Sequence, residues 1–260
     1  MLSDADRKKA AQLLLEAERT VTPVAQLADT FPGMEIADSY AIQQETLSVR
    51  LAAGARLRGH KIGLTSKVMQ ATVGIDEPDY GYLLDDMFYS DGDTVDVSRF
   101  IVPRVEVELA FILGKPLRGP GVTLFDVLDA TDYVVPALEL IDGRSRYPRK
   151  IVDNIADNAA AAGLVLGGRP VRPLDVDLRW VGALLYKNGN IEESGVSAAV
   201  LGHPAHGIAW LANKVGPFGT VLEPGHVVLA GSFTRTVAVA KGDTIHADYG
   251  PLGSVSLHFA

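Results

Sequence analysis

One charged residue, Glu139, lies inside an otherwise apolar segment of the chain, residues 133–141. An apolar run of this length is typical of a buried strand. A charge that is buried without a partner costs several kcal/mol or shifts its protonation, so the fold must bring a compensating group to Glu139. This requirement constrains which other segments can lie beside residues 133–141.

A second strand is predicted over residues 105–109, where apolar and acidic residues alternate. Glu106 and Glu108 are two positions apart, so their side chains point to the same side of that strand. By itself this pair is typical of a solvated strand face. If Glu139 joins them, the three carboxylates repel one another, and a hard divalent cation with all-oxygen ligands (Mg²⁺, Mn²⁺ or Ca²⁺) relieves the repulsion. The sequence therefore leaves two interpretations open, a solvated face and a metal site.

The hydrophobic periodicity changes near Gly59, and this change indicates the fold class. Before it, two helices are predicted, one capped by Ser3 and one over residues 36–53 that ends at Gly54. After it, short strands and turns dominate, as 26 Gly and 14 Pro favour. We expect an α+β protein with a helical N-terminal segment (1–58) packed on a β-rich catalytic domain (59–260).

Several local signals within residues 59–260 predict individual elements. Thr123 with Asp126 resembles a capping box, Pro204 is suited to open a helix, and Asn188-Gly189 is a strong hairpin turn. The hairpin strands are expected over residues 180–187 and 190–193. Further strands are expected over residues 227–230, 234–240, 244–249 and 254–259.

Composition excludes several function classes. The net charge of −8 disfavours nucleic-acid binding, which needs a basic face. The absence of cysteine excludes disulfides, thiolate catalysis and Cys-ligated metals. Residues 194–213 carry no Asp, Glu, Lys or Arg, but their His, Pro, Asn and Gly content argues against a membrane span. The first four residues lack a basic signal-peptide region, so a cytoplasmic location is expected.

Three further clusters carry candidate catalytic or binding residues. Lys61 lies between Gly59 and Gly63 in an apolar strand and is either a buried amine or a surface lysine with a buried stem. The acidic turn at residues 76–81 contains Asp79, a candidate for handling protons or orienting water. Residues 231–235 (Gly-Ser-Phe-Thr-Arg) could present donors to a carboxylate, with Arg235 adding a bidentate contact, or form an ordinary bulged strand. His203 and His206 form no convincing metal site.

Taken in order, seven short motifs make the chain resemble the hydratase/decarboxylase branch of the fumarylacetoacetate hydrolase superfamily. The resemblance covers nearly the whole chain, and within the branch residues 59–67, 85–88, 99–103 and 231–235 are most similar to a hydratase of a seven-carbon dicarboxylic acid. The seven motifs are residues 59–66, 76–81, 106–108, 136–139, 157–159, 201–204 and 252–255.

This resemblance implies a mixed sheet rolled around a metal and a homo-oligomer, often built from pentamers. It implies Mg²⁺ or Mn²⁺ on Glu106, Glu108 and Glu139. The expected substrate is a 2-hydroxy-2,4-dienoate or 2-oxo-enoate such as 2-oxo-hept-4-ene-1,7-dioate, to which water adds at C4 to give a 4-hydroxy-2-oxo acid in aromatic catabolism. Lys61 and Asp79 are expected to handle protons or orient water. The expected substrate-binding residues are Ser232, Thr234, Asn158 and, for a distal carboxylate, Arg235.

Three alternatives remain open at this point. A decarboxylase of 4-oxalocrotonate-like acids would use the same chelation, because loss of CO₂ also leaves an enolate. Hydrolysis of a C–C bond is the second, and it needs an activated water beside a β-diketone. A non-catalytic metal-binding scaffold is the third, and its Glu106→Gln variant would have no turnover to lose.

Overall fold

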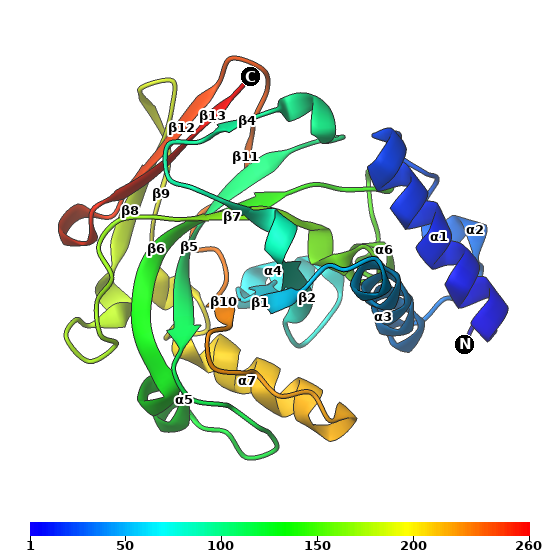
Figure 1. Ribbon diagram of the computed structural model, residues 1–260, viewed down its shortest axis with the longest axis horizontal. Helices are drawn as coiled ribbons and strands as arrows, with labels where there is room; N and C mark the ends of the chain where they lie inside the picture. Colours follow the sequence, from blue (N-terminus) through cyan, green and yellow to red (C-terminus); the bar gives the residue numbers. More distant parts are fainter.

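The computed structural model describes residues 1–260, apart from the side chains of residues 68, 69 and 73. A group of helices from the N-terminal segment packs beside a region of two sheets (Figure 1). The helices are α1 (Asp4–Thr20), α2 (Leu27–Thr30), α3 (Ile36–Ala52), α4 (Lys67–Val73), α5 (Leu124–Ala130), α6 (Ile151–Ala156) and α7 (Ala205–Val215). The strands are β1 (Leu57–Gly63), β2 (Asp79–Leu84), β3 (Phe88–Tyr89), β4 (Thr94–Val95), β5 (Arg104–Leu113), β6 (Thr131–Ile141), β7 (Ala161–Leu166), β8 (Gly182–Lys187), β9 (Asn190–Val196), β10 (Val227–Leu229), β11 (Val237–Ala238), β12 (Thr244–Asp248) and β13 (Ser254–Phe259).

The larger sheet is mixed, and its centre is the long antiparallel pair β5 and β6. Its strand order is β2-β1-β10-β5-β6-β7-β3, with β11 paired to β5 outside this path. The β1–β10 and β3–β7 pairs are parallel, whereas β5 and β6 run antiparallel along nearly their full length. In Figure 1 these two strands curve through the middle of the molecule, so the larger sheet bends into a roll. The expected α+β class with a mixed-sheet roll is confirmed.

The smaller sheet, in the order β4-β13-β12-β8-β9, covers one face of β5 and β6 and decides which way their side chains point. Val105 and Val107 of β5 and Leu138 of β6 share one buried cluster with Ile245 and Leu257 of the smaller sheet. Because side chains alternate along a strand, Glu106 and Glu108 face away from this core. The apolar packing between the sheets therefore fixes the direction of the acidic residues.

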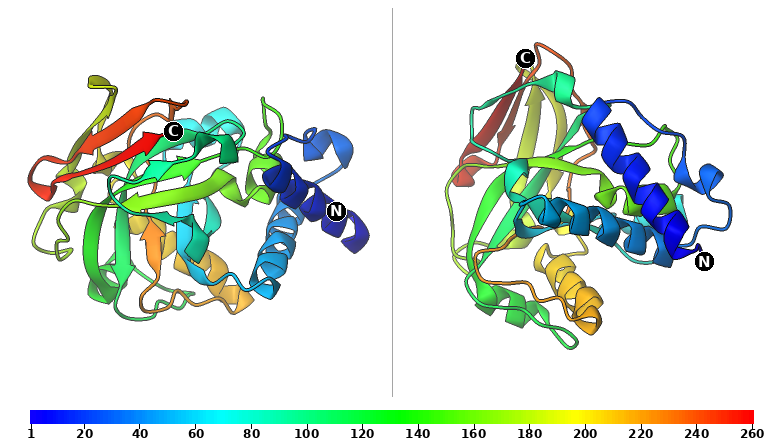
Figure 2. Two further views of the ribbon diagram at one scale, coloured as in Figure 1. Left: turned by 45° about the horizontal axis from the view of Figure 1, so that its top comes forward. Right: turned by 45° about the vertical axis from the view of Figure 1, so that its right-hand side comes forward.

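The N-terminal helices form where the caps predict them. Ser3 accepts a hydrogen bond from the Asp6 N–H at the start of α1, and α1 and α3 lie at an angle to one another beside the sheets (Figure 2). Their small apolar core includes Ala156 of α6. The division at residue 58 stays a prediction. Among the described residues, no helix combines the length and apolar character that crossing a membrane requires.

Most later elements match the expected positions, with one correction. The Asn188-Gly189 turn has positive φ at both residues, 53° and 83°, as a two-residue hairpin turn requires. A strand over residues 234–240 is wrong, because only Val237–Ala238 is a strand. Phe233 bonds to the Val107 carbonyl while Val237 lies opposite Val105. The four residue steps from Phe233 to Val237 thus run along only two steps of β5, from Val107 to Val105. The surplus residues between them bulge out of the sheet.

Candidate metal centre

The pairing of β5 with β6 brings the three predicted glutamates together. Glu106 lies directly opposite Glu139 in the register, and Glu108 lies opposite Ala137. Glu106, Glu108 and Glu139 each offer a carboxylate oxygen, and these three oxygens lie within 4.8 Å of one another. The Glu108 and Glu139 side chains are fully buried. The solvated-face interpretation is therefore wrong for Glu108, while Glu106 is only partly buried.

Burial and mutual repulsion make these carboxylates hard to ionise without a cation. Burial, and then the charge of Glu139, raises the pKa of Glu106 to about 7. The same two causes raise the pKa of Glu108 well above its usual value. Glu108 Oε1 and Glu139 Oε2 are buried and have no hydrogen-bond partner. Oxygens that lack partners, in an all-oxygen donor set, fit a hard divalent cation such as Mg²⁺ or Mn²⁺.

Lys61 is a buried amine and not a surface lysine. It extends from β1, its Nζ lies 3.2 Å from Glu139 Oε1, and it donates a 3.0 Å hydrogen bond to the Ala159 carbonyl. Burial acts to lower the pKa of Lys61, but the nearby carboxylates, Glu139 first, outweigh burial and raise it. The Ala159 carbonyl belongs to a strained turn, because residues 158–160 all adopt the left-handed conformation.

Asp79 begins β2 and lies opposite Gly63 of β1, two residues beyond Lys61. Its Oδ2 accepts a 2.8 Å hydrogen bond from Asn154, while Oδ1 is buried without a partner. A Cβ at Gly63 would lie 2.2 Å from Asp79 Oδ1 and 3.5 Å from Lys61 Nζ. The missing side chain at Gly63 thus makes room for the Asp79 carboxylate and lets it lie near the Lys61 ammonium. Burial raises the pKa of Asp79, and Lys61 and Asn154 oppose that rise.

The segment after β10 also reaches the glutamates. The Gly231 N–H donates a 2.8 Å hydrogen bond to Glu108 Oε2. Ser232 Oγ donates to the Thr234 carbonyl, and Thr234 Oγ1 is buried without a partner. The backbone of this segment therefore contacts the centre, and Thr234 keeps a polar atom free. The substrate-binding roles of Ser232 and Thr234 stay predictions.

Two predicted substrate-binding residues are occupied elsewhere. Asn158 pairs with the backbone of Tyr82, accepting from its N–H at 2.8 Å and donating to its carbonyl at 3.0 Å. Arg235 points outward with 86% of its side chain exposed and pairs with Glu193 at 2.8 Å. The bulge after Phe233 explains why Arg235 is not carried toward the glutamates. Both binding roles stay predictions.

Sequence reasoning did not identify three residues that support the centre. The Tyr249 hydroxyl is 2.9 Å from the Glu108 carbonyl and 2.6 Å from the Ala137 carbonyl, and so joins β5 to β6 behind the carboxylates. Asn154 and Arg149 lie behind Asp79. No sequence signal separates Tyr249 from an ordinary strand aromatic, and Asn154 lies just before the motif at residues 157–159 without belonging to it.

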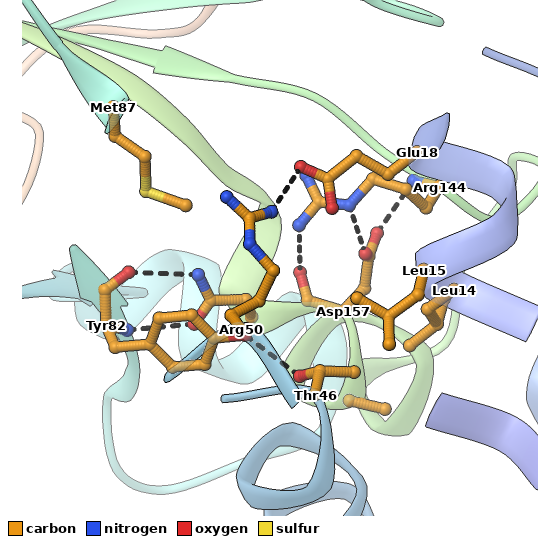
Figure 3. Close-up of a pocket in the computed structure, with 11 residues that line it drawn as sticks. Leu14, Leu15, Glu18, Thr46, Arg50, Tyr82, Met87, Arg144 and Asp157 are labelled. Atoms are coloured by element: carbon orange, nitrogen blue, oxygen red, sulfur yellow. Dashed lines mark hydrogen bonds and ion pairs between the residues drawn. The ribbon is translucent and has the colours of Figure 1, made fainter. Parts of the chain in front are cut away.

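A separate cavity lies between the N-terminal helices and the roll, and Figure 3 shows that its charged groups are paired. Arg50 binds Glu18 at 3.0 Å, and Arg144 binds Asp157 at 2.6 Å. Tyr82, drawn there, uses its hydroxyl to contact Thr46. The cavity is therefore a seam of ion pairs and hydrogen bonds, distinct from the three glutamates.

Comparisons with known proteins agree along the chain. A family model described as fumarylacetoacetate (FAA) hydrolase C-terminal matches residues 55–259. The chain is 57% identical over 256 residues to the 2-oxo-hept-4-ene-1,7-dioate hydratase of Escherichia coli, a match that covers 96% of both proteins. It is 39% identical over 250 residues to a 4-oxalocrotonate decarboxylase of Pseudomonas putida, covering 96% of this chain and 95% of that protein.

A solved structure shows the same arrangement. The 4-oxalocrotonate decarboxylase from Pseudomonas putida G7, complexed with magnesium and adipate, superposes with a TM-score of 0.97 at 38% identity. The match covers 100% of this chain and 99% of that chain, so the likeness includes the N-terminal helices as well as the sheets.

Proposed function

We propose that this chain, which belongs to the fumarylacetoacetate hydrolase family, is a metal-dependent hydratase of a 2-hydroxy-2,4-dienoate or 2-oxo-enoate. One observation carries the proposal. Carboxylate oxygens of Glu106, Glu108 and Glu139 lie within 4.8 Å of one another, in a buried site beside Lys61. The 57% identity to a 2-oxo-hept-4-ene-1,7-dioate hydratase supports that compound as the substrate. The product would be a 4-hydroxy-2-oxo acid.

The three glutamates would hold one divalent cation, Mg²⁺ or Mn²⁺. A cation held there would supply Lewis acidity, which stabilises negative charge at the 2-oxo acid end of the substrate. Two contacts fix the carboxylates in place. The Gly231 N–H donates a hydrogen bond to Glu108, and the Lys61 ammonium forms an ion pair with Glu139. The structures of a 4-oxalocrotonate decarboxylase that is 38% identical to this chain contain magnesium in one complex and calcium in another, which supports a divalent cation here.

Lys61 and Asp79 would handle the protons. Lys61 Nζ is held by the Ala159 carbonyl and by Glu139, so the ammonium has a fixed position from which to donate. Asp79 Oδ1 is unpartnered and lies beside Gly63, near the same ammonium. A carboxylate and an ammonium that lie this close to one another can move a proton on and off a substrate bound beside them. Ser232 and Thr234 would contact the substrate through their hydroxyl groups.

Decarboxylation is the second candidate, because the superposed structure is a decarboxylase. The identity values favour the hydratase, 57% against 39%. The test incubates the protein and Mg²⁺ with a 2-hydroxydienoate and, separately, with 4-oxalocrotonate. Consumption of the dienol without CO₂ release supports hydration, while CO₂ release from 4-oxalocrotonate as the faster reaction refutes it.

The Glu106→Gln variant separates an enzyme from a metal-binding scaffold. A hydratase should lose most of its turnover in this variant, since one ligand loses its charge, whereas a scaffold has none to lose. A wild-type protein that is inert toward every 2-hydroxydienoate, with Mg²⁺ and with Mn²⁺, would support the scaffold. We also propose that the protein is a cytoplasmic homo-oligomer built from pentamers, and sedimentation analysis would test the subunit number.

A further inference from the structure

Asn154, on the short helix α6, makes direct contact with the carboxylate of Asp79. Its Nδ2 donates a 2.8 Å hydrogen bond to Asp79 Oδ2. Asp79 is 1% exposed, so this oxygen has no solvent with which to replace a lost donor. The contact spans 75 residues of sequence and joins α6 to the start of β2.

Arg149 fixes which way the Asn154 amide faces. Asn154 Oδ1 accepts a 2.6 Å hydrogen bond from Arg149 Nη2. A guanidinium can only donate, so the amide oxygen must face Arg149. The amide nitrogen must then face Asp79, and the reversed amide would place two acceptors together.

Arg149 is itself held in place. Its Nη1 donates a 2.7 Å bond to the buried carboxylate of Asp157, and its guanidinium lies 4.9 Å from the centre of the Tyr147 ring. The side chain is 6% exposed. A Cβ at Gly143 would lie 3.0 Å from Nη1, so that glycine permits the close approach. Asp79, Asn154, Arg149 and Asp157 therefore form one connected series of hydrogen bonds.

This series leaves the two oxygens of Asp79 with different tasks. Oδ2 accepts a hydrogen bond from the Asn154 amide, so a proton on Oδ2 would meet the N–H group of that donor. Oδ1 is free and lies beside Gly63 and the Lys61 ammonium. We infer that Asn154 is a positioning residue that holds Asp79 so that Oδ1 alone exchanges protons with the substrate. The inference rests on the proposed function and adds to it a residue and a specific atom.

The test measures kcat and KM for a 2-hydroxydienoate with saturating Mg²⁺ in Asn154→Leu, which keeps the size of the side chain but removes the donor. We expect kcat to fall by roughly 10- to 100-fold with KM within about threefold, because a misplaced proton-transfer group slows chemistry more than binding. Asn154→Asp keeps an acceptor for Arg149 but presents a second carboxylate to Asp79, and should lose at least as much kcat.

Two controls separate positioning from a general structural role. Asn213→Leu removes an asparagine that also makes two hydrogen bonds, both to the backbone of Val122, and should keep the wild-type kcat. In an Asp79→Asn background, Asn154→Leu should cause no further loss, since the group that it positions has already been changed. A structural role would instead lower kcat by the same factor in both backgrounds.

The possible outcomes are distinct. A folded Asn154→Leu protein with wild-type kcat overturns the inference and leaves the proposed function intact, and so does an additive loss with Asp79→Asn. If Asn154→Leu fails to fold, Asn154→Asp and its combination with Asp79→Asn decide by the same criterion. A wild-type protein without hydratase activity overturns both the inference and the proposed function.

Discussion

Replacement of Gly63 by alanine tests the geometry of the site most directly. The new Cβ would lie 2.2 Å from Asp79 Oδ1 and 3.3 Å from Asp79 Cγ. The φ angle of Gly63 lies outside the left-handed region, so alanine fits the backbone and the effect is steric. Non-bonded heavy atoms are ordinarily at least about 3.5 Å apart, so the Asp79 carboxylate must move by roughly 1 Å.

A shift of that size should lower activity far more than stability. A misplacement of about 1 Å can cost on the order of 100-fold in rate, so we expect kcat/KM for the dienoate to fall by roughly that factor. Overpacking costs about 1–3 kcal/mol, and replacing a strand glycine returns about 0.5–1 kcal/mol. The net loss in unfolding free energy should thus be small, and urea unfolding would measure it.

Gly182→Ala is the matched control. Gly182 is also a strand glycine outside the left-handed region, but its added Cβ would meet only the Gly195 carbonyl oxygen, at 3.7 Å. This variant should keep the wild-type kcat/KM. If Gly63→Ala matches it in activity, Asp79 Oδ1 is not a reacting atom and the steric reasoning fails.

Three further predictions concern stability. Mg²⁺ added to metal-stripped protein at about 100 times its Kd should raise the free energy of unfolding by about 2.7 kcal/mol, which raises the thermal midpoint by roughly 5–10 °C. If a Glu139→Gln protein shows the same shift, Glu139 is not a ligand of the ion. Burial, with a smaller contribution from His226, lowers the pKa of His60 to about 3 from 6.5. The unfolded state therefore takes up a proton on His60 more readily than the folded state does. As a result, the contribution of His60 to the free energy of unfolding is highest above pH 6.5 and falls as the pH drops toward 3. Between pH 7 and 5 the wild type should lose about 2 kcal/mol more unfolding free energy than His60→Gln, and equal losses would contradict this. Tyr249→Phe removes the hydroxyl that contacts carbonyls of β5 and β6 and should cost about 1–3 kcal/mol in urea unfolding, whereas Tyr133→Phe, at a half-exposed position, should cost little.

Local rules predicted much of the fold because they depend on few neighbours. Ser3 and Thr123 cap helices as expected, and Asn188-Gly189 forms the hairpin turn. The alternation around Glu106 and the lone charge at Glu139 predicted two strands correctly. The sequence alone could not fix the register that places these two residues opposite one another, since register depends on which strands pair.

The remaining features depend on long-range contacts. Arg235 was expected near the substrate, but the bulge in residues 234–236 turns it toward Glu193. Asn154 gave no signal, because its partners are Asp79, 75 residues away, and Arg149, on a loop. The left-handed turn at residues 158–160 lies at non-glycine residues, where propensity predicts an ordinary conformation.

Hydration and decarboxylation share one requirement, a charge that develops on the 2-oxygen of the substrate. A divalent cation held by the three glutamates would meet that requirement for either reaction, which is consistent with one fold being shared with proteins that bear both names. The reactions differ in what must reach carbon: hydration needs both a proton and a water, whereas decarboxylation needs a proton alone after CO₂ leaves. The choice between them therefore depends on the groups that place protons and water, which in this chain are Lys61, Asp79 and the Asn154 amide behind Asp79.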